Sequence, residues 1–157
     1  QSNIMKMDEN DFKELTLPDK AVGFYHEFNH NNMMGAYDPF LKVIKEMKEH
    51  IGMSDEELLR LSGACLHHYD IFKSYFATGV CKRKDWPILT ELEYEKKRIL
   101  QAIVKMLKVL SDRCLILVLL NNIQMISTST IQLLELIVNE SVNNLRIIGI
   151  MNQSPHF

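Results

Sequence analysis

The sequence predicts an α/β domain built on a parallel sheet, and three segments carry this prediction. Leu115–Leu120 is wholly apolar, as is typical of a strand that is buried on both faces of a parallel sheet. Leu145–Met151 is a second apolar run. Between them, Ile131–Val138 has helical periodicity and the length of a crossover helix, which joins parallel strands.

The 157 residues fit a single domain, residues 1–157, with a sizeable core. We divide this α/β domain, or fragment of one, into a strand and loop (20–36), a helical insertion (37–89) and a helix–strand–helix–strand core (90–152). A net charge of −2 provides no basic surface for nucleic acid, so no such partner is expected. No apolar run reaches the roughly 18 residues that a membrane span needs.

The three cysteines, Cys65, Cys81 and Cys114, lie far apart in the chain and are odd in number. This pattern indicates free thiols in a reducing compartment rather than a disulfide framework, so we expect a cytoplasmic location.

The first half of the chain starts with a polar stretch, Gln1–Asn10, which we expect to be frayed, and Asp11–Leu17 is expected to end a helix. Ala21–Phe28 begins apolar and carries aromatic residues, which favours a strand. Asp38 and Pro39 then suit the N-cap and first position of a helix.

Further helices follow in the insertion and the core. Gly52 suits the end of the first of them, and Ser54–Glu57 is a capping box that starts the next. A third helix is expected over about Cys65–Phe76. Thr90–Glu93 is a second capping box, and it opens the longest helix, which ends near Leu110.

Polar residues follow the central strand directly. Asn121 and Asn122 close it, and the turn Ser127–Thr130 precedes the crossover helix. Ligands of parallel sheets bind at the carboxyl ends of the strands, so this is the candidate site.

Motifs of catalytic, metal and phosphate sites are missing from the sequence. It contains no G-x-x-x-x-G-K-[ST], no G-x-G-x-x-G and no G-x-S-x-G. His26 and His30 are the only histidines four residues apart, and they straddle an expected strand and loop. We therefore assign no catalytic and no metal-binding residue.

The stretch Leu115–Leu134 resembles the Walker B region of P-loop NTPase (AAA/STAND-like) modules, found in soluble adenylyl cyclases and LuxR-type regulators. The apolar strand, the two positions that are acidic in the family, Thr130 at the family Ser position and Leu133–Leu134 keep the family spacing. Upstream, Tyr37–Phe40 fits a family segment of the type Tyr-x-Pro-Phe. The resemblance covers roughly residues 20–152 and implies a partial three-layer form of the P-loop NTPase-like fold.

The resemblance also implies what has changed. The acidic pair, which holds Mg²⁺ in the family, is Asn121 and Asn122 here; a family Asp is Ser127, and a frequent Arg is Asn152. These four residues are nucleotide-site remnants. A degenerate Walker B without a Walker A implies a non-catalytic or degenerate ATPase-like regulatory module of a larger signalling protein, which acts through the nucleotide-site remnants or through protein contacts. Its partners would be other domains of the same polypeptide or regulatory proteins.

Two expectations follow from this resemblance. ATP and Mg²⁺ would be cofactors only if a phosphate-binding loop lay upstream of Gln1. Asn121 and Asn122 should face a water-filled cleft, so replacing both by Asp should cost only about 1 kcal/mol.

A second resemblance is to STAS domains, the anti-sigma-factor antagonists. Ile123–Ile131 followed by Arg146–Ile150 fits their pattern of strand, hydroxyl-rich turn, helix and strand. In that alternative Ser127–Thr130 would hold a phosphorylated hydroxyl at a helix N-terminus, and the domain would act by protein–protein binding.

Overall fold

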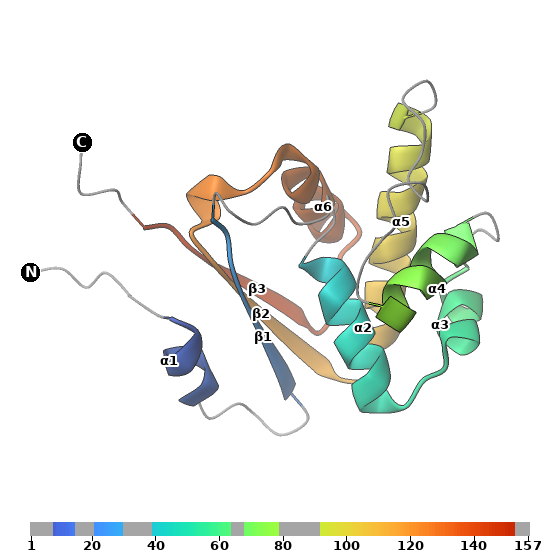
Figure 1. The fold of residues 1–157 in the computed structure, drawn as a ribbon, viewed down its shortest axis with the longest axis horizontal. Coiled ribbons are helices and arrows are strands. Elements are labelled where there is room, and N and C mark those ends of the chain that lie inside the picture. The colour runs from blue at the N-terminus through green and yellow to red at the C-terminus, as the bar shows by residue number, and fades with distance from the viewer. Residues whose placement is uncertain (1–7, 15–20, 30–38, 64–67, 79–91, 153–157) are drawn as a thin grey trace, which may run out of the picture.

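The computed structural model describes residues 8–14, 21–29, 39–63, 68–78 and 92–152, and these form an α/β fold. Its sheet has three parallel strands in the order β1-β2-β3 (Figure 1). The strands are β1 (Ala21–Glu27), β2 (Leu115–Asn121) and β3 (Leu145–Ile150). The predicted parallel pairing of the two apolar runs is confirmed.

Six helices are described around this sheet in the part of the chain that the structure covers. They are α1 (Glu9–Glu14), α2 (Phe40–Ile51), α3 (Asp55–Ser62), α4 (Tyr69–Thr78), α5 (Leu92–Ser111) and α6 (Thr128–Asn139). The crossover helix is confirmed as α6, the long helix as α5, and the insertion is helical in its described parts.

Local signals set several helix ends. The backbone N–H of Glu57 donates to Ser54 Oγ at 3.1 Å, which makes Ser54 the N-cap of α3. Gly52 and Gly63 end α2 and α3 in the left-handed conformation, with φ of 78° and 67°. Helix α2 begins at Phe40, one residue later than predicted. The expected cap at residue 38 and the box at 90–93 lie wholly or partly outside the described residues.

The N-terminal expectation was wrong in part, because a helix begins within the stretch expected to be frayed. Asp8 and Asp11 cap α1 reciprocally. The N–H of Asp11 donates to Asp8 Oδ1 at 2.8 Å, and the N–H of Asp8 donates to Asp11 Oδ2 at 3.3 Å. This cap sets the start of α1, which the polar composition of the stretch does not indicate.

One face of the sheet, here called the helical face, carries the core. Helices α2, α5 and α6 cover it, and α3 and α4 pack against them farther out (Figure 1). Alternate residues of β2 enter this core because side chains of a strand alternate between faces. The fully buried side chains include Phe40, Ile44, Met47, Phe72, Ile99, Ile103, Met106, Leu107, Leu110 and Ile116.

The opposite face, here called the α1 face, is covered in the described part of the chain only by α1 (Figure 1). Phe12 of α1 packs there with Leu119 and Ile150. Leu115 and Leu117 are only half-buried on this face. The prediction that the central strand is buried on both faces was therefore wrong at these two residues, since a six-residue helix covers less of a sheet than a helical layer does.

Among the helices of the described part, none combines the length and the apolar character that crossing a membrane requires.

Candidate functional site

The carboxyl ends of the three strands lie side by side. The register pairs Glu27 with Asn121 across β1 and β2, and Asn121 with Ile150 across β2 and β3. The chain continues from these ends into Phe28, Asn122 and Asn152. This alignment brings together three of the four predicted site residues, Asn121, Asn122 and Asn152, at one edge of the sheet.

The amide of Asn121 lies at the centre of this group. Its Nδ2 donates to Tyr25 Oη at 2.8 Å and to Glu27 Oε1 at 3.2 Å. Its Oδ1 accepts the Asn122 backbone N–H at 2.9 Å and Asn152 Nδ2 at 2.8 Å. Both N–H donors and the oxygen of the amide are thus used within the protein.

Asn122 has an unusual backbone. Its φ of 59° and ψ of 47° lie in the left-handed region, which Asn tolerates better than most residues. Its Nδ2 donates to Phe28 O at 3.2 Å, and its Oδ1 accepts from Asn152 Nδ2. The residue turns the chain from β2 into the 3-10 helix Ile123–Met125 while its side chain ties that turn to the ends of β1 and β3.

Asn152 closes the group from the β3 side. Its Nδ2 donates to both neighbouring asparagine oxygens, and its backbone N–H donates to Gln124 Oε1 at 3.3 Å. The three asparagines, with Tyr25 and Glu27, form what we call the amide cluster.

The amide cluster contradicts one expectation. Asn121 was expected to face a water-filled cleft, but its side chain is buried, with 5% of the residue exposed. The cause is the side-chain alternation of the strand: Asn121 points to the α1 face, between Tyr25 and the end of β3. Asn122, by contrast, is partly exposed.

Ser127, the fourth predicted residue, has a local role. It is the N-cap of α6, since the Thr130 N–H donates to its Oγ at 3.2 Å, and its Oγ lies 2.9 Å from Thr130 Oγ1. Within the described part of the chain, the side chain of Ser127 bonds to Thr130 and not to the amide cluster.

Sequence reasoning missed Tyr25 and Glu27. The Tyr25 hydroxyl donates to Glu27 Oε1 at 3.4 Å, and burial is the main cause that raises the pKa of Tyr25. The signal that would have found both is strand alternation: residues 25 and 27 share a face and end a strand that pairs with β2.

The amide cluster has limited chemistry. Glu27 is its only carboxylate, and neutral amides bind Mg²⁺ weakly and cannot act as general bases. Among the described residues, no three His, Cys, Asp or Glu side chains gather closely enough to hold a metal ion. A cavity bordered by described residues lies along the outer edge of β1; Tyr25 of the amide cluster lines it, but none of the three asparagines does.

Comparisons with known proteins add no relative: no family model, no curated protein and no solved structure matches this chain.

Proposed function

We propose that this chain is a non-catalytic, degenerate ATPase-like regulatory module of a larger signalling protein, of the soluble adenylyl cyclase or transcription-regulator type. It works through protein contacts. The observation that carries the proposal is the amide cluster, in which Asn121, Asn122 and Asn152 hydrogen-bond to one another at the carboxyl ends of three parallel strands.

The charge of the cluster supports this proposal. A nucleotide site needs carboxylates for Mg²⁺ and for orienting water. The two positions that correspond to the acidic pair are neutral amides here, and Asn121 already donates to Glu27 Oε1 at 3.2 Å. A divalent cation would have to displace that donor, and the amide cluster itself would supply only the Glu27 carboxylate.

The packing supports it as well. The core of the helical face consists of apolar side chains from five helices and three strands, and it includes no nucleotide-site remnant. A fold of this kind keeps its shape without nucleotide, which is what a module that acts by contact requires.

The proposal favours the NTPase-like interpretation over the STAS alternative. In the alternative, a hydroxyl among Ser127–Thr130 accepts phosphate. Thr130 is 2% exposed, and Ser127 Oγ already caps α6. The long α5 also lies within the layer that packs on the sheet, as a helix of the NTPase-like module does and as the STAS pattern does not require.

The test is ATP turnover and binding by the purified chain with Mg²⁺. We expect no phosphate release above buffer and no calorimetric heat of Mg²⁺–ATP binding at the amide cluster. Asn122→Ala serves as the matched control, because it removes one remnant and leaves the buried Asn121. Phosphate release by the native chain that Asn122→Ala abolishes would overturn the proposal.

The STAS alternative has its own readout in the same experiment. Ser129→Asp places a negative charge in the first turn of α6, beside the cap. Under the proposal, this variant leaves the binding of partner domains unchanged. A change in partner binding with an intact fold would favour the STAS interpretation instead.

A further inference from the structure

Strand β1 is an edge strand, and its outer edge is unpaired among the described residues. The Phe28 N–H donates inward to Asn121 O at 3.0 Å. Because successive residues of a strand direct their N–H and C=O groups to opposite sides, Gly23 and Tyr25 direct theirs outward. An extended chain can pair with such groups.

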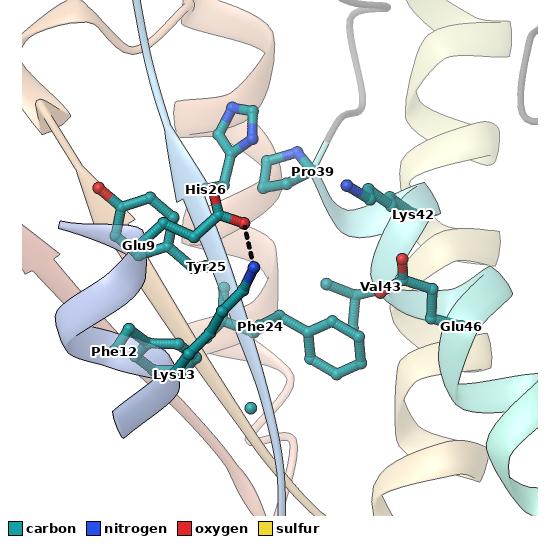
Figure 2. A pocket seen from close by; sticks show the side chains of 12 residues that line it. Glu9, Phe12, Lys13, Phe24, Tyr25, His26, Pro39, Lys42, Val43 and Glu46 are labelled. Atoms are coloured by element: carbon teal, nitrogen blue, oxygen red, sulfur yellow. Dashed lines mark ion pairs between the residues drawn. The ribbon is translucent and has the colours of Figure 1, made fainter. Parts of the chain in front are cut away.

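A groove follows this edge between two helices (Figure 2). Its cavity has a volume of about 210 Å³, and four consecutive β1 residues, Gly23–His26, form its floor. One wall is α1, with Glu9, Phe12 and Lys13. The other wall is α2, and its residues are Pro39, Lys42, Val43 and Glu46.

The size of the groove limits the occupant. Small-molecule sites usually enclose about 300–1,000 Å³. A cavity of about 210 Å³ along four strand residues instead fits a short length of extended peptide. Gly23 leaves no side chain on the α1 side of the floor, so a backbone can approach there.

The two walls differ in whether their charged side chains form an ion pair. On the α1 wall, Glu9 and Lys13 pair with each other at 3.5 Å. On the α2 wall, Lys42 and Glu46 are exposed, and neither forms an ion pair with another described residue. The α2 wall thus offers one positive and one negative charge toward the groove.

The spacing of these two charges matches a strand. Lys42 and Glu46 lie one helical turn apart, about 5.4–6 Å along the axis. Side chains two residues apart on a strand lie on one face, about 6.6–6.8 Å apart. An extended peptide can therefore place an acidic side chain at Lys42 and a basic one at Glu46.

We propose that the groove between α1 and α2 is a strand-addition site for an extended peptide with one acidic and one basic side chain two residues apart. The side chain between them is apolar and points to Phe12 and Tyr25 on the α1 side. The inference concerns a partner class and does not depend on the amide cluster being inactive, so ATP assays neither support nor weaken it.

The first experiment measures binding of three labelled peptides by fluorescence anisotropy. They are Val-Asp-Val-Lys-Val, Val-Asp-Val-Asp-Val and Val-Lys-Val-Lys-Val, with blocked ends. The native chain should bind the mixed peptide about fivefold more tightly than either like-charged peptide, as expected for one exposed ion pair gained and one repulsion removed.

Variants of the α2 wall make the test independent of peptide direction. Lys42→Glu should shift the preference to the two-lysine peptide, and Glu46→Lys should shift it to the two-aspartate peptide. Lys105→Glu, an exposed change on α5 outside the groove, is the control and should keep the native order. Circular dichroism checks that each variant is folded.

A second measurement tests the backbone pairing itself. In this test, one backbone nitrogen of Val-Asp-Val-Lys-Val is methylated at a time. Methylation should abolish peptide binding at every second position and leave it intact at the positions between, because alternate N–H groups face β1. Hydrogen exchange at Tyr25 should slow on binding. Absence of binding by all three peptides, an unchanged preference in both α2 variants, or uniform sensitivity to methylation would each overturn the proposal.

Discussion

The helical face and the carboxyl edge of the same sheet are built in opposite ways. The helical face buries aliphatic and aromatic side chains from five helices, and many of these side chains have no exposed surface. The carboxyl edge is held by hydrogen bonds between neutral amides. Apolar burial contributes in proportion to area, whereas a net hydrogen bond contributes only about 1 kcal/mol. The stability of the fold therefore depends mainly on the first region, whereas the hydrogen bonds of the second region hold the ends of the three strands together.

Truncating the helical core should have the largest effect. Phe40 of α2 has no exposed surface and packs in the core cluster, so Phe40→Ala leaves a cavity. The free energy of unfolding should fall by about 3–5 kcal/mol. Chemical denaturation measures this loss. A loss below about 1 kcal/mol would mean that α2 is not part of the cooperative core.

Charging the amide cluster should have the next largest effect. In Asn121→Asp, a buried carboxylate replaces the Nδ2 donor and meets the Glu27 carboxylate, to which that donor now hydrogen-bonds at 3.2 Å. Denaturation at pH 7 should show a loss of about 2–4 kcal/mol. This revises the loss of about 1 kcal/mol expected for a solvated cleft.

Asn122→Asp provides the comparison for that substitution. Asn122 is partly exposed, so its variant should lose only about 1 kcal/mol. Equal losses for the two variants would contradict the difference in burial on which the account depends.

Acidification should destabilise the fold less than Asn121→Asp does, through the protonation of His26. Burial, helped by Lys42, lowers the pKa of His26 from 6.5 to about 4. The unfolded chain therefore binds more protons than the folded chain between these values, and stability falls as the pH falls through this window. With solvent screening the loss is of order 1–2 kcal/mol. Chemical denaturation of His26→Gln should show a free energy of unfolding that depends less on pH between 6.5 and 5 than that of the native chain. An unchanged slope would mean that other groups cause the pH dependence.

Removing the α6 cap should have the smallest effect. Ser127→Ala deletes the acceptor for the Thr130 N–H and should cost about 1 kcal/mol. Ser127→Asn, which keeps an N-cap oxygen, is the matched control and should retain most of the stability. A loss of more than about 3 kcal/mol for the alanine variant would indicate that Ser127 does more than cap the helix.

Much of the fold was predictable because its signals are local and strong. The apolar runs ending at Leu120 and Met151, and the helical period between them, predict two parallel strands and a crossover. The cap of α1 was not predicted, since Asp8 and Asp11 lie in a stretch without apolar periodicity.

The site was predictable only in part. Ligands bind at the carboxyl ends of parallel strands, so Asn121 and Asn122 were expected at the site, and the family resemblance added Asn152. The burial of Asn121 was not expected, because it depends on which face the strand gives to Tyr25, and that contact joins residues 96 positions apart. The groove beside β1 likewise requires the placement of α1 and α2, which no local pattern encodes.

A double-mutant cycle on Asn121 and Asn152 tests most directly whether the asparagines bind one another rather than serve a ligand. Asn121→Ala, Asn152→Ala and the double variant are compared with the native chain by chemical denaturation in the absence of nucleotide. The hydrogen bond of 2.8 Å between these amides predicts a coupling free energy of about 1 kcal/mol. The stability losses of the two single variants should therefore add up to about 1 kcal/mol more than the loss of the double variant. Additive losses would contradict the account, because the two side chains would then stabilise the fold independently.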